Sequence, residues 1–411
     1  MDKTKTVFSS ADILIPKYAE QKDEMKKWAV IACDQFTSDT AYWTACREVI
    51  GGAASTYDYI LPEAYLETEM EEKHKFEIAQ NMVAFSADTM KKISGFIYLE
   101  RTLPNGSIRH GLIGKMDLEE YDYTAGSHSK IRATEATVIE RIPSRCKVRE
   151  SARIELPHIL VIIDDTTGLF AKLDYEKSSY NIAYDFDLMQ GGGHVVGYEI
   201  TGEKASAVTS AIHEYESSTG EIVYAMGDGN HSLAAAKAHW ENLKKKGVSL
   251  DHPARYALCE ITSLLDESLV FEPIYRVVQN CDVQDLLSSL SKITTPTVED
   301  EGQIINVIVG NESKKVRFNN PTHALTVGSL QNFIDEYLRE HSGSSCDYIH
   351  GEDVVNTLAK AQGTVGFTLD VMDKGELFSY VENNGTLPRK TFSMGEAESK
   401  RYYLEARMIV E

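Results

Sequence analysis

Residues 224–236 read YAMGDGNHSLAAA, in which an apolar strand runs into a glycine-rich turn and then into a helix. Gly227 and Gly229 permit backbone conformations with positive φ, and they let a ligand approach the main chain closely. The N–H groups of such a turn, together with the N-terminal end of the helix, form a ready binding site for an anion. The pattern predicts a strand over 221–226 and a helix over 233–246.

The side chains of this turn suit phosphate chemistry. Asp228 is a carboxylate that can hold a metal ion or accept a proton, and His231 can bind a phosphate or carry a proton because its ordinary pKa lies near neutrality. Asn230 and Ser232 add polar groups beside it. An Asn- or Asp-capped helix after a tight turn explains the same residues equally well. The sequence contains no Walker A pattern, and the turn lacks the third glycine of a Rossmann fingerprint.

On either side of this turn, strands and helices alternate, which favours an α/β to α+β fold with mixed sheets and flanking helices. Apolar runs predict strands and amphipathic runs predict helices. The predicted strands are 28–33, 96–101, 108–113, 156–163, 194–200, 256–262, 304–309, 316–318 and 365–369. The predicted helices are 71–92, 175–189, 204–215, 283–290 and 329–339.

These elements divide into three predicted regions: an N-terminal α+β region over 1–128, a central α/β region over 129–292 and a C-terminal α+β region over 293–411. The polar segment 294–303 is the best candidate for a linker.

Composition narrows the classes of function. The chain has 411 residues, with 42 Lys and Arg against 63 Asp and Glu, so its net charge of −21 argues against nucleic acid as a partner. No long apolar stretch predicts a membrane span, and no signal peptide is visible. The six cysteines form no C-x-x-C pair. We expect a cytoplasmic protein that binds small molecules; the sequence leaves its oligomeric state open.

Three further residues are candidates for the same chemistry. Asp34 follows a predicted strand, a common position for a catalytic carboxylate; helix capping or solvation in a loop is the alternative. Arg389 and Lys390 form a basic pair in an acidic chain, and an arginine fork with a lysine charge can clamp a phosphate. Solvation at the surface is the alternative for this pair.

A last group of polar residues is less specific. Arg132, Glu135 and Arg141 lie in an alternating polar and apolar stretch, either as substrate-binding groups or as ordinary ion pairs. His194 follows Gly191–Gly193, a run that precedes a strand and that a flexible connection explains; a direct role in binding substrate is the alternative.

These segments together resemble a bacterial and archaeal family catalogued as domain of unknown function ten-fifteen. The resemblance is carried by 28–37, 131–135, 191–194, 227–231 and 388–396, and it extends over essentially the whole chain.

The turn is also similar to the Asp-Gly-x-His-Arg signature of the ParB/sulfiredoxin superfamily, which Asp228, Gly229 and His231 match. Ser232 stands where an arginine is usual. In that superfamily the signature binds nucleotide phosphates, and some members phosphorylate free serine. The resemblance therefore implies a nucleotide site here, and we expect Arg389 or Lys390 to replace the missing arginine.

The expected function is nucleotide-dependent phosphoryl transfer to a small hydroxylated metabolite such as serine, with Mg²⁺ and ATP or ADP. A non-catalytic nucleotide-binding or regulatory protein is the alternative. A metabolite hydrolase is a third hypothesis, but the chain has no G-x-S-x-G nucleophile elbow.

Overall fold

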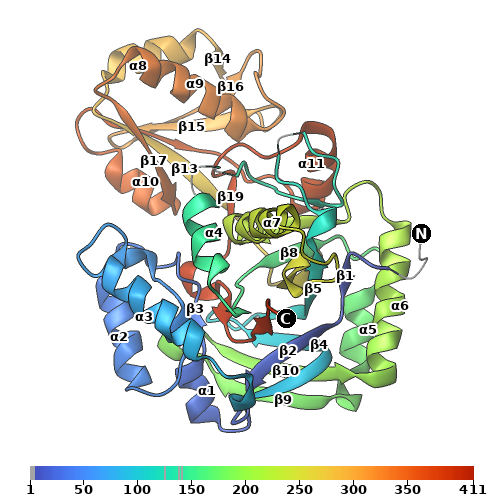
Figure 1. Cartoon of the computed structure of the whole chain (residues 1–411). Coiled ribbons are helices and arrows are strands. Elements are labelled where there is room, and N and C mark those ends of the chain that lie inside the picture. The colour runs from blue at the N-terminus through green and yellow to red at the C-terminus, as the bar shows by residue number, and fades with distance from the viewer. Residues whose placement is uncertain (1–4, 125, 138, 140–141) are drawn as a thin grey trace. The chain divides into compact units, whose positions relative to one another are not determined.

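The computed structural model describes residues 5–124, 126–137, 139 and 142–411 (Figure 1). The chain divides into two compact units. The first unit contains residues 1–269, 381–386 and 396–411, and the second contains 270–380 and 387–395. The chain thus leaves the first unit and returns to it.

A mixed sheet dominates the first unit. In the described chain it has ten strands, eight of them in the order β6-β11-β8-β12-β5-β4-β10-β9, with β1 beside β5 and β2 beside β4. Pairing is antiparallel except between β6 and β11 and between β8 and β12. The strands are β1 (Phe8–Ser9), β2 (Ala11–Pro16), β4 (Met90–Thr102), β5 (Ile108–Asp117), β6 (Ile131–Arg132), β8 (Leu160–Ile163), β9 (Asn181–Asp187), β10 (His194–Thr201), β11 (Tyr224–Asp228) and β12 (Tyr256–Ser263).

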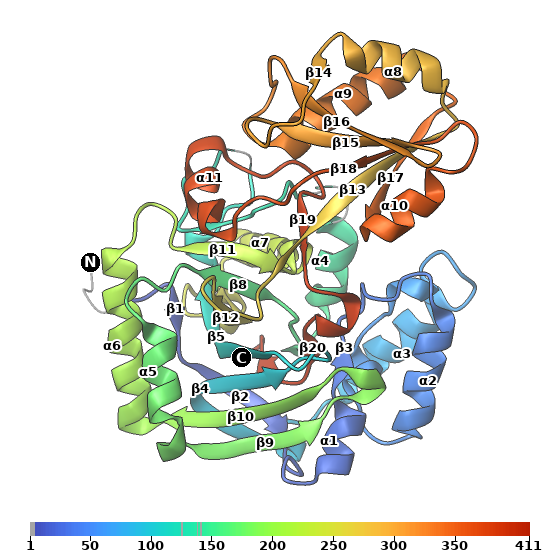
Figure 2. The same cartoon turned by 180° about the vertical axis from the view of Figure 1, so that it is seen from behind.

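Helices cover this sheet on both sides. Helices α5 and α6 lie side by side on one side of the first unit, while α1, α2 and α3 lie on the other, as Figures 1 and 2 both show. The helices of this unit are α1 (Lys22–Trp28), α2 (Thr40–Ile50), α3 (Glu71–Ala84), α4 (Ile142–Glu150), α5 (Leu169–Glu176), α6 (Gly202–Ser218) and α7 (Asn230–Lys245). Two small ribbons, β3 (Val30–Ile31) with β20 (Tyr402–Tyr403) and β7 (Ile154–Glu155) with β21 (Arg407–Met408), tie the C-terminal segment to this unit.

Strand β4 shows how the sequence builds two cores on one sheet. Ile97 and Leu99 point into a core that also contains Trp28 and Trp43. Their neighbours Phe96 and Tyr98 point into the opposite core, with Leu233, Ala236 and Trp240 of α7. Alternate residues of a strand face opposite sides of a sheet, so a largely apolar strand buries both faces.

The second unit has its own sheet and core. Its described strands follow the order β14-β16-β15-β18-β13-β17, with β19 beside β13. They are β13 (Phe271–Gln279), β14 (Thr294–Pro296), β15 (Ile304–Val309), β16 (Glu312–Phe318), β17 (Ser345–His350), β18 (Val365–Thr368) and β19 (Phe392–Met394). The helices are α8 (Val283–Ser291), α9 (Thr326–Glu340) and α10 (Glu352–Leu358). Helix α11 (Leu377–Asn384) begins in the second unit and ends in the first, because the chain passes from one unit to the other after Tyr380.

The structure confirms the mixed α/β class, with corrections of detail. The predicted helix over 71–92 is too long, because α3 ends at Ala84 and β4 begins at Met90. The predicted helix over 175–189 is wrong: α5 ends at Glu176, and 181–187 forms the edge strand β9. Buried Ala183, Tyr184 and Phe186 do not alternate strictly with exposed residues in this strand, so the spacing of its apolar residues imitates an amphipathic helix. The predicted strand over 28–33 shortens to Val30–Ile31, because Trp28 ends α1.

A further correction concerns chain organisation. The predicted linker 294–303 lies inside the second unit, where residues 294–296 form β14. The three expected regions also differ from the two units: 1–128 and 129–292 share one sheet, and the second unit begins at Val270. No helix in the described ranges is both long and apolar enough to cross a membrane.

Candidate functional site

The turn between β11 and α7 has the shape that the sequence predicts. Asp228 ends the strand, Gly229 precedes the helix with a φ of 82°, and α7 starts at Asn230. The Gly229 N–H donates a hydrogen bond of 2.7 Å to Asp228 Oδ1. A Cβ at Gly229 would lie 3.0 Å from the Cα of Ile159. Both its φ and this close approach therefore require glycine.

The start of α7 is not capped in the way the alternative interpretation requires. The N-cap residue is Gly229, and within the described chain no side chain makes an N-cap hydrogen bond there. The helix buries Leu233 and Trp240 as predicted. Asn230 and His231 lie half-buried in its first turn. The positive end of the helix dipole thus has no carboxylate cap from its own N-cap residue.

Lys400 supplies a positive charge at this turn. Its Nζ lies 3.7 Å from Asp228 Oδ2, and its side chain is 16% exposed. The sequence analysis missed this residue, because it is distant in the chain and belongs to no motif. The available signal was a second basic pair, Lys400-Arg401, in an acidic chain.

Two buried arginines hold the segment that carries Lys400. Arg101 of β4 donates hydrogen bonds to the carbonyl oxygens of Glu398 at 2.7 Å and of Lys400 at 2.5 Å. Arg109 of β5 donates to the carbonyl of Ser399 at 3.0 Å. Because both guanidinium groups are buried, the backbone around Lys400 is fixed against the sheet.

Asp34 lies in the loop after β3 and is a carboxylate at neutral pH. Burial opposes its ionisation, but His158, Arg145 and local hydrogen bonds outweigh burial and lower the pKa of Asp34. Its Oδ1 is buried and has no hydrogen-bond partner among the described residues. A buried acceptor without a partner costs free energy, which makes it a candidate contact for a ligand or an ion.

A shared framework joins the Asp34 loop to the Asp228 turn. His158, which helps to lower the pKa of Asp34, directly precedes the Ile159 that packs on Gly229. The His158 ring also meets the Tyr403 ring edge-on, with centroids 5.3 Å apart. The N–H of Cys33, beside Asp34, donates to the Tyr403 hydroxyl at 3.3 Å.

Oxygen donors dominate this site. The Oδ1 of Asn230 is buried and, within the described ranges, accepts no hydrogen bond, as is true of Asp34 Oδ1. The Asn230 amide oxygen and the Asp228 carboxylate, neighbours in the turn, are the hard oxygen ligands that Mg²⁺ prefers. The donor set therefore fits Mg²⁺.

Arg132 and Glu135 lie on the segment beside β11. Arg132 pairs in register with Ala225, and its Nη2 donates to Glu221 Oε2 at 3.2 Å. The Thr134 hydroxyl donates to the carbonyl of Met226 at 2.7 Å, which places half-buried Glu135 near the end of β11. Arg141 lies outside the described residues.

His194 lies far from the turn in the sheet, since the four strands β8, β12, β5 and β4 stand between β10 and β11. Its ring nitrogens contact Asp187 at 2.7 Å and Asp185 at 2.9 Å. Two of the three glycines before it, Gly192 and Gly193, are closely packed, which a flexible connection would not require. A Cβ at Gly192 would lie 2.2 Å from the Tyr402 hydroxyl oxygen, and one at Gly193 would lie 1.9 Å from the Thr102 carbonyl oxygen.

Arg389 and Lys390 belong to the second unit. Arg389 forms an ion pair with Asp335 and lies over the Tyr348 ring at 5.8 Å. Lys390 is exposed and has a φ of 55°. Their expected approach to the α7 turn stays a prediction.

Fold and site define a mixed α/β protein with a glycine-rich turn at a helix N-terminus. A family described as "Protein of unknown function (DUF1015)" matches residues 14–403, and the chain belongs to this family. No curated protein matches the sequence.

Several solved structures are distantly similar. A mutant free serine kinase in complex with AMP is 14% identical, with a TM-score of 0.40, over 69% of this chain and 92% of that chain. SbnI with C-terminal truncation from Staphylococcus aureus is 12% identical, with a TM-score of 0.35, over 73% of this chain and 83% of that chain. Likenesses this weak define neither the site nor the activity of this chain.

Proposed function

We propose that the turn at Gly227–Ser232 binds the phosphates of ATP or ADP and that the protein transfers a phosphoryl group to a small hydroxylated metabolite such as serine. The observation that carries this proposal is the contact of Lys400 with Asp228 at the N-terminal end of α7. It brings a cation, a carboxylate and a helix N-terminus together, which are the groups that phosphoryl transfer uses.

The phosphate site rests on the main chain. The backbone N–H groups at the start of α7 can donate to phosphate oxygens, and the dipole of α7 favours negative charge there. Lys400 takes the role that the resemblance assigns to an arginine at position 232, with Arg389 and Lys390 as the alternative that the sequence favours. A lysine acts as a point charge where an arginine would form a fork.

Polar side chains of the site carry out the remaining steps of the proposed reaction. Asp228 and Asn230 would hold Mg²⁺, which when bound spreads positive charge over the phosphates. The acceptor hydroxyl oxygen attacks the terminal phosphorus, the bond from that phosphorus to the bridging oxygen breaks, and the nucleotide leaves with one phosphate fewer. Asp34, already ionised, accepts the hydroxyl proton. His231 donates to the developing negative charge on the phosphate oxygens.

A non-catalytic nucleotide-binding protein is the second candidate. Ser232 in place of arginine favours it, because a charge that would stabilise the transition state is missing there. Nucleotide binding without any product distinguishes this candidate from the kinase.

The test compares Lys400→Gln with Lys17→Gln, a change at an exposed lysine outside the site. We expect Lys400→Gln to weaken ATP and ADP binding at least tenfold in calorimetric titrations, whereas Lys17→Gln binds as the parent does. Equal nucleotide binding by the parent and by Lys400→Gln would show that the Lys400–Asp228 contact has no part in nucleotide binding, and it would contradict the proposal.

A further inference from the structure

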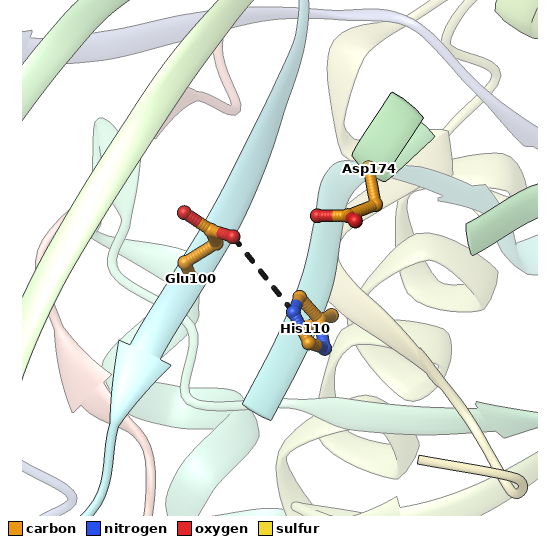
Figure 3. A group of neighbouring side chains, drawn as sticks. All are labelled: Glu100, His110 and Asp174. Carbon is orange, nitrogen blue, oxygen red and sulfur yellow. Dashed lines mark ion pairs between the residues drawn. The ribbon is translucent and has the colours of Figure 1, made fainter. Parts of the chain in front are cut away.

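A second polar cluster lies on β4, β5 and α5 of the first unit. Glu100 and His110 are cross-strand neighbours in register, and Asp174 of α5 lies beside them (Figure 3). One ligand atom from each of the three side chains lies within 4.8 Å of the other two. Strands β8 and β12 separate β5 from β11, so the cluster is distinct from the α7 turn.

The cluster holds His110 in the orientation of a metal ligand. Its Nδ1 lies 2.9 Å from Asp266 Oδ2, and the same oxygen accepts the His110 backbone N–H at 3.0 Å. This leaves Nε2 facing Glu100 Oε1 at 3.8 Å (Figure 3). A carboxylate that accepts from one ring nitrogen while the other meets a ligand group is the usual support of metal-bound histidine.

Glu100 is oriented in the same way. The Tyr198 hydroxyl donates to Glu100 Oε2 at 2.9 Å, which leaves Oε1 for the cluster. The Lys177 ammonium lies 2.5 Å from that Oε1 and 2.9 Å from Asp174 Oδ1. A cation therefore already stands between the two carboxylates, carried by a side chain that is 36% exposed.

Tyr98 adds a buried polar group beside the cluster. Its side chain is fully buried, and its ring stacks on His110. Burial first, and then the charges of Asp174, Glu100 and Asp266 and an interaction of the hydroxyl with the Asp174 side chain, raise the pKa of Tyr98. Tyr98 therefore stands beside Asp174 as Tyr198 stands beside Glu100.

We propose that Glu100, His110 and Asp174 bind a divalent transition-metal ion, Zn²⁺ or Mn²⁺, which displaces the Lys177 ammonium. One nitrogen and two carboxylate oxygens suit these ions. The divalent ion neutralises both ligand carboxylates, whereas Lys177 neutralises one. Asp266 and Tyr198 hold the ligands in place, and the Tyr98 hydroxyl stands beside Asp174.

Calorimetric titration of the full chain with ZnCl₂ and with MnCl₂, after treatment with a chelator, tests this site. We expect one ion per chain. Asp174→Asn, at an exposed position on α5, and His110→Gln should each weaken binding at least tenfold. Lys177→Gln should tighten binding severalfold, because it removes the competing ammonium. Melting curves identify any variant that fails to fold, and Asp174→Asn remains informative if His110→Gln does not fold.

Two matched controls exclude binding elsewhere. His128 lies 3.2 Å from Glu221 on the surface, and His194 lies between two aspartates. Neither His128→Gln nor His194→Gln should change the affinity. The proposal is overturned if Lys177→Gln binds neither ion, or if Asp174→Asn and His110→Gln bind both ions as tightly as the parent does.

Discussion

Asp228 serves two neighbours with one carboxylate. Oδ1 accepts from the Gly229 N–H, and Oδ2 faces Lys400. The aspartate was recognisable in the sequence because it stands between two glycines at the junction of a strand and a helix. Lys400 was not, because only the folded chain brings it to the turn. A local sequence pattern therefore predicts the backbone turn of a site. It does not predict a charged residue that tertiary structure brings there from a distant part of the chain.

Asp228→Asn should abolish phosphoryl transfer and leave the fold intact. Asparagine keeps the acceptor for Gly229, and the partly exposed pair with Lys400 contributes little, so stability should change by less than roughly 1 kcal/mol. Assays of transfer from ATP and ADP with melting curves check this, with Asp88→Asn at an exposed site as the control. Full activity would show that Asp228 is structural only.

His239 should make the protein less stable in mild acid. This histidine of α7 is 6% exposed, and its burial, followed by the charge of Arg149, lowers its pKa from 6.5 to about 4. Between these two pKa values, His239 is protonated in the unfolded chain but not in the folded chain. The contribution of His239 to the free energy of unfolding is therefore complete above pH 6.5 and is lost as the pH falls toward 4. The loss is about 1.4 kcal/mol per pH unit.

Denaturant unfolding at pH 7.5 and at pH 5 measures this effect. Because other groups titrate as well, the informative quantity is the difference between the parent and His239→Gln, whose stability should fall less between the two pH values. An equal fall in both proteins would mean that His239 is accessible to protons in the folded state.

At the scale of elements, the hairpin of β4 and β5 and the helix α7 were predictable, and β9 was not. An Asn-Gly turn marks the hairpin, and a regular apolar face marks the helix. The pairing that makes β9 a strand comes from β10, so the residues of β9 do not reveal it by themselves. The packed glycines before His194 were misread for a related reason, because Tyr402 and Thr102 approach them from elsewhere in the chain.

Gly229→Ala tests the close approach within the α7 turn. Gly247 is a matched control: its φ is also 82°, but a Cβ there meets no described atom within 4 Å. Both alanines incur the left-handed backbone cost of about 1–2 kcal/mol, and Gly229→Ala adds the contact with Ile159.

We expect denaturant unfolding to show the larger loss of stability for Gly229→Ala. Nucleotide binding should be weakened in this variant alone, because only Gly229 lies in the proposed phosphate site. If the two variants lose the same amount of stability and both still bind nucleotide as the parent does, the turn at Gly229 is not a phosphate site.

At the scale of the whole molecule, the sequence indicated the mixed α/β class but not how the chain is divided. The second unit is inserted between parts of the first, and residues 396–411 return to complete the first unit. No change in amino-acid composition marks the points at which the chain leaves a discontinuous unit and returns to it. Lys400 belongs to that returning segment, so the division of the chain and the place of Lys400 were missed for the same physical reason.

Nucleotide binding should also stabilise the whole first unit, because a ligand that binds the folded state shifts unfolding by mass action. At a hundredfold excess over its dissociation constant, ATP or ADP should add about 2.7 kcal/mol to the free energy of unfolding. Thermal melts should show this increase in the parent protein and a reduced one in Lys400→Gln. No shift with either nucleotide would argue against a nucleotide site.

The most direct test of the central claim is the transfer of phosphate itself. Purified protein is incubated with Mg²⁺, with ATP or ADP labelled on the terminal phosphate, and with a panel of hydroxylated metabolites that includes serine, and phosphorylated products are separated. We predict a phosphorylated acceptor in the parent and in Asp88→Asn, and none in Asp228→Asn. Tight nucleotide binding with no labelled product from any acceptor, or the same product yield from Asp228→Asn as from the parent, would contradict the account.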